Sequence, residues 1–247
     1  MTPIYSKPLL ALAAIALALL PACAQQGGAS KAEIEKIIEE YIVENPEIIE
    51  RAFLALQEKE KVARAEAAKA AIAENASQLY NQKSDYSIGP ADAKVTVVEF
   101  FDYRCGFCKT SLEEVQGLPK KYDGEVRVVF KELPLFSGIS TTAAQAALAA
   151  GKQGKYVQMH VALMSVKSND DLTEAKIEEL AQSIGVNVAK MRADMNSPAV
   201  LKQLEESTNL AHTLLVGGTP GFFIGDQHIE GPDFAAIEAA IEAELKG

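Results

Sequence analysis

Bulky apolar residues recur at helical spacing in the first part of the chain that follows residue 30. Ser30 with Glu33 three positions later is a capping-box pattern, so the sequence predicts a helix that opens at Ser30. Asn45-Pro46 ends this helix and starts another, because Asn is a favoured cap and Pro suits the first helical turn. Together the two helices carry one apolar stripe: Ile34, Ile37, Ile38, Tyr41, Ile42, Ile48, Ile49, Ala52, Phe53 and Leu56.

Residues 59–77 have a different composition, rich in Ala, Glu and Lys with few bulky side chains. This composition favours a solvated connector helix that cannot bury a core alone. The apolar stripe before it is larger than a lone appendage should expose, so residues 31–80 are expected to join copies of the chain into a homo-oligomer. The alternative is that the stripe folds back on its own domain and leaves a monomer.

The pattern changes again after residues 81–93, a polar stretch that contains Gly and Pro. Apolar runs predict four strands, the last two joined by a tight Gly225-Asp226 hairpin: residues 95–101, 125–131, 222–224 and 227–230. Helical patterns occupy three further regions: residues 109–116, most of 139–216, and 233–245. This order predicts an α/β fold with one mixed central sheet, flanking helices and a helical insertion at about 139–216.

Residues 1–24 have the pattern of an export signal. Lys7 is their only charge, residues 9–20 are apolar, and Ala22-Cys23-Ala24 offers a small-residue cleavage site. The apolar stretch is short for a membrane span, which needs roughly 20 residues. In an alternative interpretation Cys23 becomes lipid-modified and anchors the mature chain. The expected organisation is a signal peptide (1–24), a helical extension (25–82) and a larger domain (83–247).

The formal net charge of the chain is −10, and removal of Lys7 with the signal makes the mature chain more acidic still. An acidic surface argues against nucleic acid and anionic membrane as partners. The mature length suits one medium domain with an appendage. Export leaves two free cysteines, Cys105 and Cys108, too few for a structural disulfide framework.

The motif Cys105-Gly106-Phe107-Cys108 lies between a predicted strand and a predicted helix. Two cysteines at this spacing can close a small disulfide ring with little backbone movement. Cys105 also lies at a helix N-terminus, where unpaired N–H groups and the macrodipole favour a thiolate. Because the thiolate is the species that attacks disulfides, the motif predicts thiol–disulfide exchange. Cys105 is expected to be the exposed nucleophile with a low pKa, and Cys108 the buried resolving thiol.

Other uses of the cysteine pair are a structural bridge or half of a metal site. A zinc site needs further soft ligands, and the remaining candidates are widely spaced and fit surface positions: His160, His212 and His228. No resident metal or other cofactor is expected beyond the dithiol itself. Cu(I) accepts two thiolates, so a copper- or client-binding chaperone is the rival from another class. A structural envelope protein with a functional stalk is a third, weaker alternative.

The segment Glu99-Phe-Phe-Asp-Tyr-Arg-Cys-Gly-Phe-Cys-Lys109, with Thr219-Pro-Gly-Phe-Phe-Ile224 downstream, resembles the DsbA family of thioredoxin-fold disulfide oxidoreductases. The resemblance covers about residues 94–247. The segment Glu44-Asn-Pro-Glu-Ile48 further resembles the ScsC-type subgroup, which is linked to copper-stress tolerance and includes members that trimerise through the extension. The resemblance implies a periplasmic enzyme that acts on cysteine-containing client proteins and exchanges electrons with a membrane redox partner.

The resemblance also implies roles for residues around the cysteines. It implies that Thr219-Pro220 is a cis dipeptide facing the motif, where an unpaired backbone edge binds an extended client peptide. Gly106 and Phe107 would add contacts to the client. Glu99 would lie beneath the cysteines and relay a proton for the resolving thiol. A strand residue that reaches solvent is the alternative for Glu99.

The direction of electron flow follows from the dipeptide between the cysteines. Family members with His inside the motif gain thiolate stabilisation there, and Gly106-Phe107 lacks it. Arg104, just before the motif, offers partial compensation. The sequence therefore favours isomerase or reductase chemistry, with a DsbA-like dithiol oxidase as the alternative.

Overall fold

The computed structural model describes residues 30–247. The predicted export signal, its cleavage site and Cys23 lie outside these residues. The chain divides into two compact units, the first ending at Gln57 and the second running from Glu58 to Gly247. Within the described residues, every helix is too short or too polar to cross a membrane.

The first unit begins with helix α1 (Lys31–Glu44), which starts at the predicted capping box. The Glu33 N–H donates to Ser30 Oγ, and the Ser30 N–H donates to the Glu33 carboxylate at 2.7 Å. Helix α2 (Glu47–Glu74) follows the predicted break. The apolar stripe is largely exposed in the single chain; Ile37 and Phe53, for example, are 59% and 58% exposed.

The second unit is built on a five-stranded mixed sheet with the order β1-β3-β2-β4-β5. Strands β2 (Val95–Phe101) and β3 (Val126–Glu132) are parallel, and helix α4 (Gly106–Lys121) connects them. The other pairs are antiparallel and involve β1 (Tyr86–Ile88), β4 (Gly221–Ile224) and β5 (Gln227–Glu230). The predicted mixed sheet is confirmed, with the addition of β1, whose three residues are too few to show a strand pattern.

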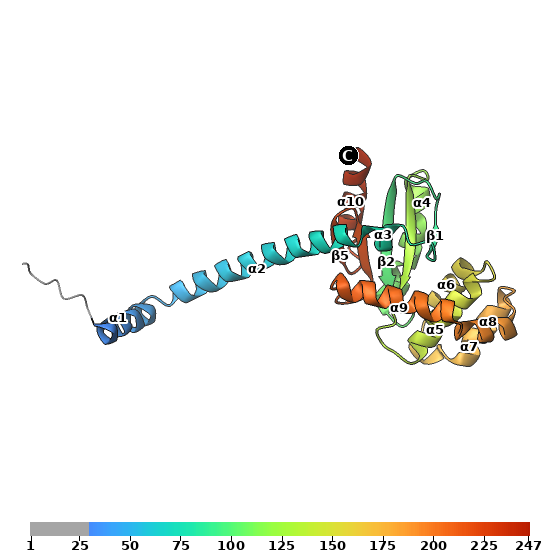
Figure 1. Cartoon of the computed structure of the whole chain (residues 1–247), viewed down its shortest axis with the longest axis horizontal. Helices are drawn as coiled ribbons and strands as arrows, with labels where there is room; N and C mark the ends of the chain where they lie inside the picture. Colours follow the sequence, from blue (N-terminus) through green and yellow to red (C-terminus); the bar gives the residue numbers. More distant parts are fainter. Residues whose placement is uncertain (1–29) are drawn as a thin grey trace, which may run out of the picture. The chain divides into compact units, whose positions relative to one another are not determined.

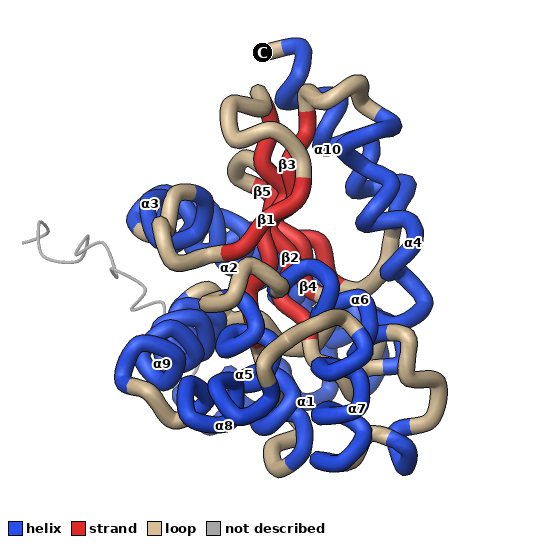
Figure 2. Tube along the Cα trace, turned by 90° about the vertical axis from the view of Figure 1, so that its right-hand side faces the viewer, coloured by secondary structure: helices blue, strands red, loops and turns tan. Residues whose placement is uncertain are grey.

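Helices cover both faces of the sheet (Figure 2). Helices α4 and α10 (Phe234–Lys246) pack on one face, and α3 (Ala76–Tyr80) and α9 (Pro198–Thr213) pack on the other. Side chains of β2 alternate between the two cores. Val97 and Phe101 join the core that holds both cysteines, whereas Val98 and Phe100 face the α3 and α9 side. This alternation places Glu99 on the cysteine face.

The helical insertion gathers beyond one end of the sheet (Figure 1). The predicted helical block is confirmed. Its helices are linked by short turns and by the 3₁₀ turn η1. Before α9 it contains α5 (Ile139–Gly151), α6 (Tyr156–Met164), η1 (Asn169–Asp171), α7 (Glu174–Ser183) and α8 (Val188–Met195). The turn η1 follows α6 and reaches the beginning of α4, where Lys109 contacts it.

The root of the helical extension belongs to the second unit. Ile72 and Leu79 are 3% and 0% exposed and pack against Phe100 and neighbouring core residues. The Tyr80 hydroxyl donates to the carbonyl of Gly225 in the β4–β5 turn at 2.8 Å. The compact unit that contains the sheet thus takes in residues from Glu58 onward, because the sheet buries the few bulky residues of the Ala-rich segment. The expected domain boundary at 82/83 stays a prediction.

Candidate active site

The cysteine motif opens helix α4 directly after the central strand β2. Cys105 is the N-cap residue, with extended backbone at φ −74° and ψ 117°. Its N–H donates to the Asp102 carbonyl at 3.0 Å, and its carbonyl accepts from the Lys109 N–H at 3.1 Å. The motif thus sits where the first N–H groups of a helix have no intrahelical partner, a position that favours an anion.

Cys105 has the environment of a nucleophilic thiol. Hydrogen bonding from the Cys108 side chain is the main cause that lowers the pKa of Cys105 to about 5. Burial opposes this effect, and hydrogen bonds from the Thr219 side chain and from the backbone of Cys108 and Phe107 add to it. The thiol is 5% exposed. The expectation of an exposed Cys105 is therefore wrong for the single chain, because the loop that carries Thr219 covers the sulfur.

Cys108 has the opposite environment. It is 1% exposed, one turn inside the helix, and burial raises its pKa far above the ordinary value. Its S–H stabilises the Cys105 thiolate, and Glu99 adds a further charge that disfavours ionisation of Cys108. One sulfur is thus prepared to attack and the other to remain protonated until a base assists it.

The Thr219-Pro220 peptide bond is cis, as the resemblance implied. The Cys105 Sγ donates to the Thr219 carbonyl at 3.0 Å, so the dipeptide lies directly against the nucleophilic sulfur. The Pro220 carbonyl accepts from the Gly231 N–H at 2.8 Å, and strand β4 begins at the next residue. The sequence placed these two segments 114 positions apart, and the fold brings them into contact.

Glu99 lies within the core on the cysteine face of β2, only 3% exposed, which rules out the solvent-facing alternative. Burial, reinforced by the charge of Cys105, raises the pKa of Glu99 to about 8. Lys131 is on the adjacent strand, but it points to the other face, where it pairs with Asp85 at 2.6 Å. Glu99 is therefore mostly a neutral acid at neutral pH, and it becomes a carboxylate base as the pH rises through about 8.

The raised pKa of Glu99 predicts a pH-dependent stability. The unfolded carboxyl ionises near pH 4, whereas the folded one stays protonated to about pH 8, so its burial destabilises the protein increasingly between these values. Glu99→Gln is expected to raise the melting temperature of the reduced protein by at least about 3 °C at pH 8 and to change it little at pH 4. The control is Glu205→Gln on the surface. A gain that is equal at both pH values would contradict this assignment.

The dipeptide between the cysteines is accessible. Phe107 is 65% exposed, and the space beside Gly106 is open within 4 Å of a side-chain carbon added there. Phe136, in the loop after β3, is 52% exposed, and the Arg104 guanidinium lies 5.8 Å from its ring centre. Apolar and cationic groups thus border the motif.

Asp102 anchors the loop that leads into the motif, a role that the sequence did not reveal. Its carboxylate accepts from the Arg104 N–H at 2.7 Å, from the Ser140 hydroxyl at 2.8 Å and from the Phe136 N–H at 3.1 Å. Asp102 is 1% exposed. The three donors come from the motif loop, α5 and the loop after β3, so this one carboxylate fixes their positions relative to Cys105.

A second buried polar cluster lies behind the motif and corrects the surface placement of His160. Glu132 Oε1 accepts from the hydroxyls of Tyr156 at 2.8 Å and Tyr103 at 3.1 Å, and Tyr103 contacts His160 Nδ1 at 3.3 Å. His160 is 1% exposed, and burial lowers its pKa to about 3. The helical spacing of Tyr156 and His160 was the available signal, since four residues apart they share one face of α6.

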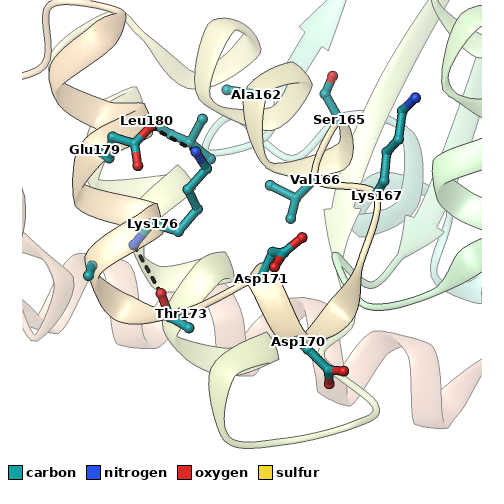
Figure 3. A pocket seen from close by; sticks show the side chains of 11 residues that line it. Ala162, Ser165, Val166, Lys167, Asp170, Asp171, Thr173, Lys176, Glu179 and Leu180 are labelled. Carbon is teal, nitrogen blue, oxygen red and sulfur yellow. Dashed lines mark hydrogen bonds and ion pairs between the residues drawn. The ribbon is translucent and has the colours of Figure 1, made fainter.

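One hollow borders the motif, and a second shares two lining residues with it. The first, about 560 Å³, is lined by Gly106, Lys109, Met164 and Lys167, among others. The second, about 800 Å³, lies between the end of α6 and α7 and is shown in Figure 3. Ser165 and Lys167 line both hollows, and Asp170 and Asp171 of η1 line the second. Neither hollow contains the sulfur of Cys105 or Cys108.

Comparison with known proteins agrees with this site. A family model described as Thioredoxin matches residues 81–243, and one described as Copper resistance protein ScsC N-terminal domain matches residues 31–63. The structure of Proteus mirabilis ScsC in a transitional conformation is 31% identical, with 87% of this chain and 96% of that chain covered and a TM-score of 0.64. The thiol-disulfide exchange protein alpha-DsbA2 from Wolbachia pipientis is 26% identical, with 73% and 97% covered and a TM-score of 0.67.

Among curated relatives, the Na(+)/H(+) antiporter NhaA 3 of Salinispora tropica is 31% identical over 160 residues. The match covers 64% of this chain but 24% of the antiporter, so the chain spans about a quarter of the length of that relative. The shared region therefore informs the thioredoxin-like part and not ion transport. With both family models matched in sequence order, the chain belongs to the thioredoxin-like thiol-disulfide oxidoreductases of the DsbA and ScsC type.

Proposed function

We propose that this chain is a periplasmic protein disulfide isomerase or reductase that acts through Cys105 and Cys108 on exported client proteins. One observation carries the proposal: a thiol with a pKa of about 5 lies 3.0 Å from the backbone of a cis Thr219-Pro220 dipeptide. A nucleophilic sulfur next to a peptide-binding edge suits a client held as an extended strand. The predicted export signal supplies the compartment, where client disulfides form.

In the proposed reaction the Cys105 thiolate attacks one sulfur of a client disulfide. A mixed disulfide forms between Cys105 and the client, and the other client sulfur leaves as a thiolate. Glu99 then takes the proton of Cys108, whose thiolate attacks Cys105 and releases the second client thiol. Two electrons pass from the motif to the client, and the motif becomes a disulfide. In isomerisation, the thiolate of a different client cysteine instead attacks the client sulfur of the mixed disulfide, so that a new client disulfide forms and Cys105 leaves as a thiolate.

The pKa of Cys105 supports a reduction potential between those of thioredoxin and DsbA. A pKa of about 5 for Cys105 lies between the values of about 7 in thioredoxin and about 3.5 in DsbA. The stabilisation comes from Cys108 and from backbone groups, which replace part of what a histidine in the motif would supply. A less stabilised thiolate leaves the disulfide form less oxidising than in DsbA.

Equilibration with glutathione tests the direction of electron flow. The motif is expected to have a reduction potential of about −200 mV, more reducing than the roughly −120 mV of DsbA and less reducing than the roughly −270 mV of thioredoxin. The oxidised fraction is read by alkylation and mass spectrometry at each glutathione ratio. A value as oxidising as that of DsbA would replace the isomerase proposal with a dithiol oxidase that a membrane partner reoxidises.

We also propose that the extension assembles the protein. The stripe on α1 and the first half of α2 leaves large apolar side chains exposed, including Ile38 at 51%, Tyr41 at 57% and Ile49 at 54%. Packing these side chains between copies removes them from water. Several tethered active sites then act on one client at high local concentration, which suits the release and recapture that isomerisation requires.

A further inference from the structure

The side chain of Asn169 touches both flanks of the cysteine motif. Its Nδ2 donates to the Arg104 carbonyl at 2.9 Å, immediately before Cys105. Its Oδ1 accepts from the Lys109 ammonium at 2.8 Å, immediately after Cys108. Asn169 belongs to η1 in the helical insertion and lies 60 or more positions from these partners. One amide from a distant segment therefore bridges the four-residue motif.

The direction of the Lys109 side chain gives this bridge a chemical consequence. Lys109 lies four residues after Cys105, one helical turn away, and its N–H bonds to the Cys105 carbonyl. Residues at this spacing are neighbours on a helix surface, and helical side chains lean towards the N-terminus. A Lys109 side chain bound at Asn169, which is itself bound to the Arg104 carbonyl, points back towards the start of α4, where the Cys105 sulfur lies.

Lys167 also lines the hollow beside Gly106, but Lys109 is the lysine that is bonded to Asn169. The remaining charged groups next to Cys105 supply no comparable cation. Arg104 directs its guanidinium over Phe136. Asp102 is occupied by its three donors, and Glu99 lies in the core as an acid with a raised pKa. Cys108 is protonated. Burial lowers the pKa of Lys109 overall, and the charges of Asp102 and, to a smaller extent, Cys105 favour its ammonium form.

We propose that Asn169 is a positioning residue of the active site, whose amide holds the Lys109 ammonium on the Cys105 side of α4 and so stabilises the attacking thiolate. This inference rests on the proposed role of Cys105 as nucleophile. It gives the helical insertion a function in the chemistry, because η1 delivers the amide. Gly106-Phe107 has no cationic side chain, and Lys109, one helical turn after Cys105, supplies the cation instead.

The residues around the Asn169 bridge line both hollows. Lys109 lines the hollow next to Gly106, and Asp170, the neighbour of Asn169, lines the hollow of Figure 3. A movement of η1 would change the distance from the Lys109 ammonium to the Cys105 sulfur while leaving the backbone of α4 in place. The side chain of Asn169 thereby links the position of the helical insertion to the reactivity of the Cys105 thiol.

The experiment titrates the Cys105 thiolate in the reduced, full-length mature protein, by near-ultraviolet absorbance and by the rate of alkylation at Cys105. Asn169→Ala is expected to raise the pKa of Cys105 by about half a pH unit, and thus to lower the thiolate fraction roughly threefold below that pKa. Asn169→Asp is expected to raise it further, because it adds a negative charge and loses the donor to the Arg104 carbonyl. Asp170→Asn, in the same turn, is the matched control and is expected to cause no increase.

Lys109→Met decides whether Asn169 acts through Lys109. Lys109→Met alone should raise the pKa of Cys105 by at least as much as Asn169→Ala, and adding Asn169→Ala to it should cause no further increase. The proposal is overturned if Asn169→Ala leaves the titration unchanged while lowering the melting temperature, since the amide is then only structural. It is also overturned if the two effects add in full. Because thiolate titration needs no client, failure of the proposed function would appear separately, as loss of exchange with an intact titration.

Discussion

Cys105→Ala is expected to abolish disulfide exchange, at least about a hundredfold below the unchanged protein, whereas Cys108→Ala is expected to trap clients as mixed disulfides. The difference follows from the two environments of the thiols. Cys105 is ionised near neutral pH and lies against the cis dipeptide, so only its sulfur is prepared for attack. Cys108 is buried and protonated, and its removal deletes the step that releases the client.

The measurement is non-reducing electrophoresis of each variant after expression in the periplasm, followed by mass spectrometry of the trapped species. A double variant that lacks both cysteines is the control for adventitious binding. Iodoacetamide should modify Cys105 of the reduced native protein first. Faster modification of Cys108, or mixed disulfides trapped through Cys108 in the Cys105→Ala variant, would reverse the roles of the two cysteines.

The central part of this fold is readable from the sequence because its elements are long and regular. Residues 95–101 are apolar apart from Thr96 and Glu99, and strand β2 has the same bounds. The Gly225-Asp226 hairpin and the helical block also follow from local patterns. The contact between Cys105 and Thr219 is different in kind. It joins segments 114 positions apart, and no local pattern encodes it; the expectation came from resemblance to a family.

Other features were hidden because burial, not residue type, decides them. Glu132 and His160 look like surface residues of a strand and a helix, but they become a satisfied polar cluster once Tyr103 and Tyr156 are brought between them. Asn169 lies in a short 3₁₀ turn inside the segment that the sequence predicts to be mostly helical. Its importance appears only when the insertion places it against both flanks of the motif.

Removing residues 30–57 is expected to convert an assembled protein into a monomer that still reduces disulfides but isomerises them poorly. The stripe carries its large apolar residues on the part that is removed, including Ile37, Tyr41 and Phe53, all more than half exposed in the single chain. The compact unit that begins at Glu58 retains both cysteines and the cis dipeptide. Reduction needs one active site, so its rate should stay within about twofold, whereas isomerisation should fall at least about tenfold with the loss of tethered sites.

Light scattering of the mature protein and of the chain starting at Glu58 measures assembly, and refolding of a scrambled disulfide substrate measures isomerisation. A monomeric mature protein would refute the assembly proposal, and equal isomerisation by both chains would separate assembly from function.

A chain starting at Asp85 is the contrasting truncation. It also loses Ile72 and Leu79, which are buried against the sheet, and the bonds from Tyr80 to Gly225 and from Lys131 to Gln78. Loss of two buried aliphatic side chains costs roughly 4 kcal/mol or more, so this shorter chain should be unstable rather than merely monomeric. Stability is therefore expected to change between the starts at Glu58 and Asp85, whereas the oligomeric state changes before Glu58.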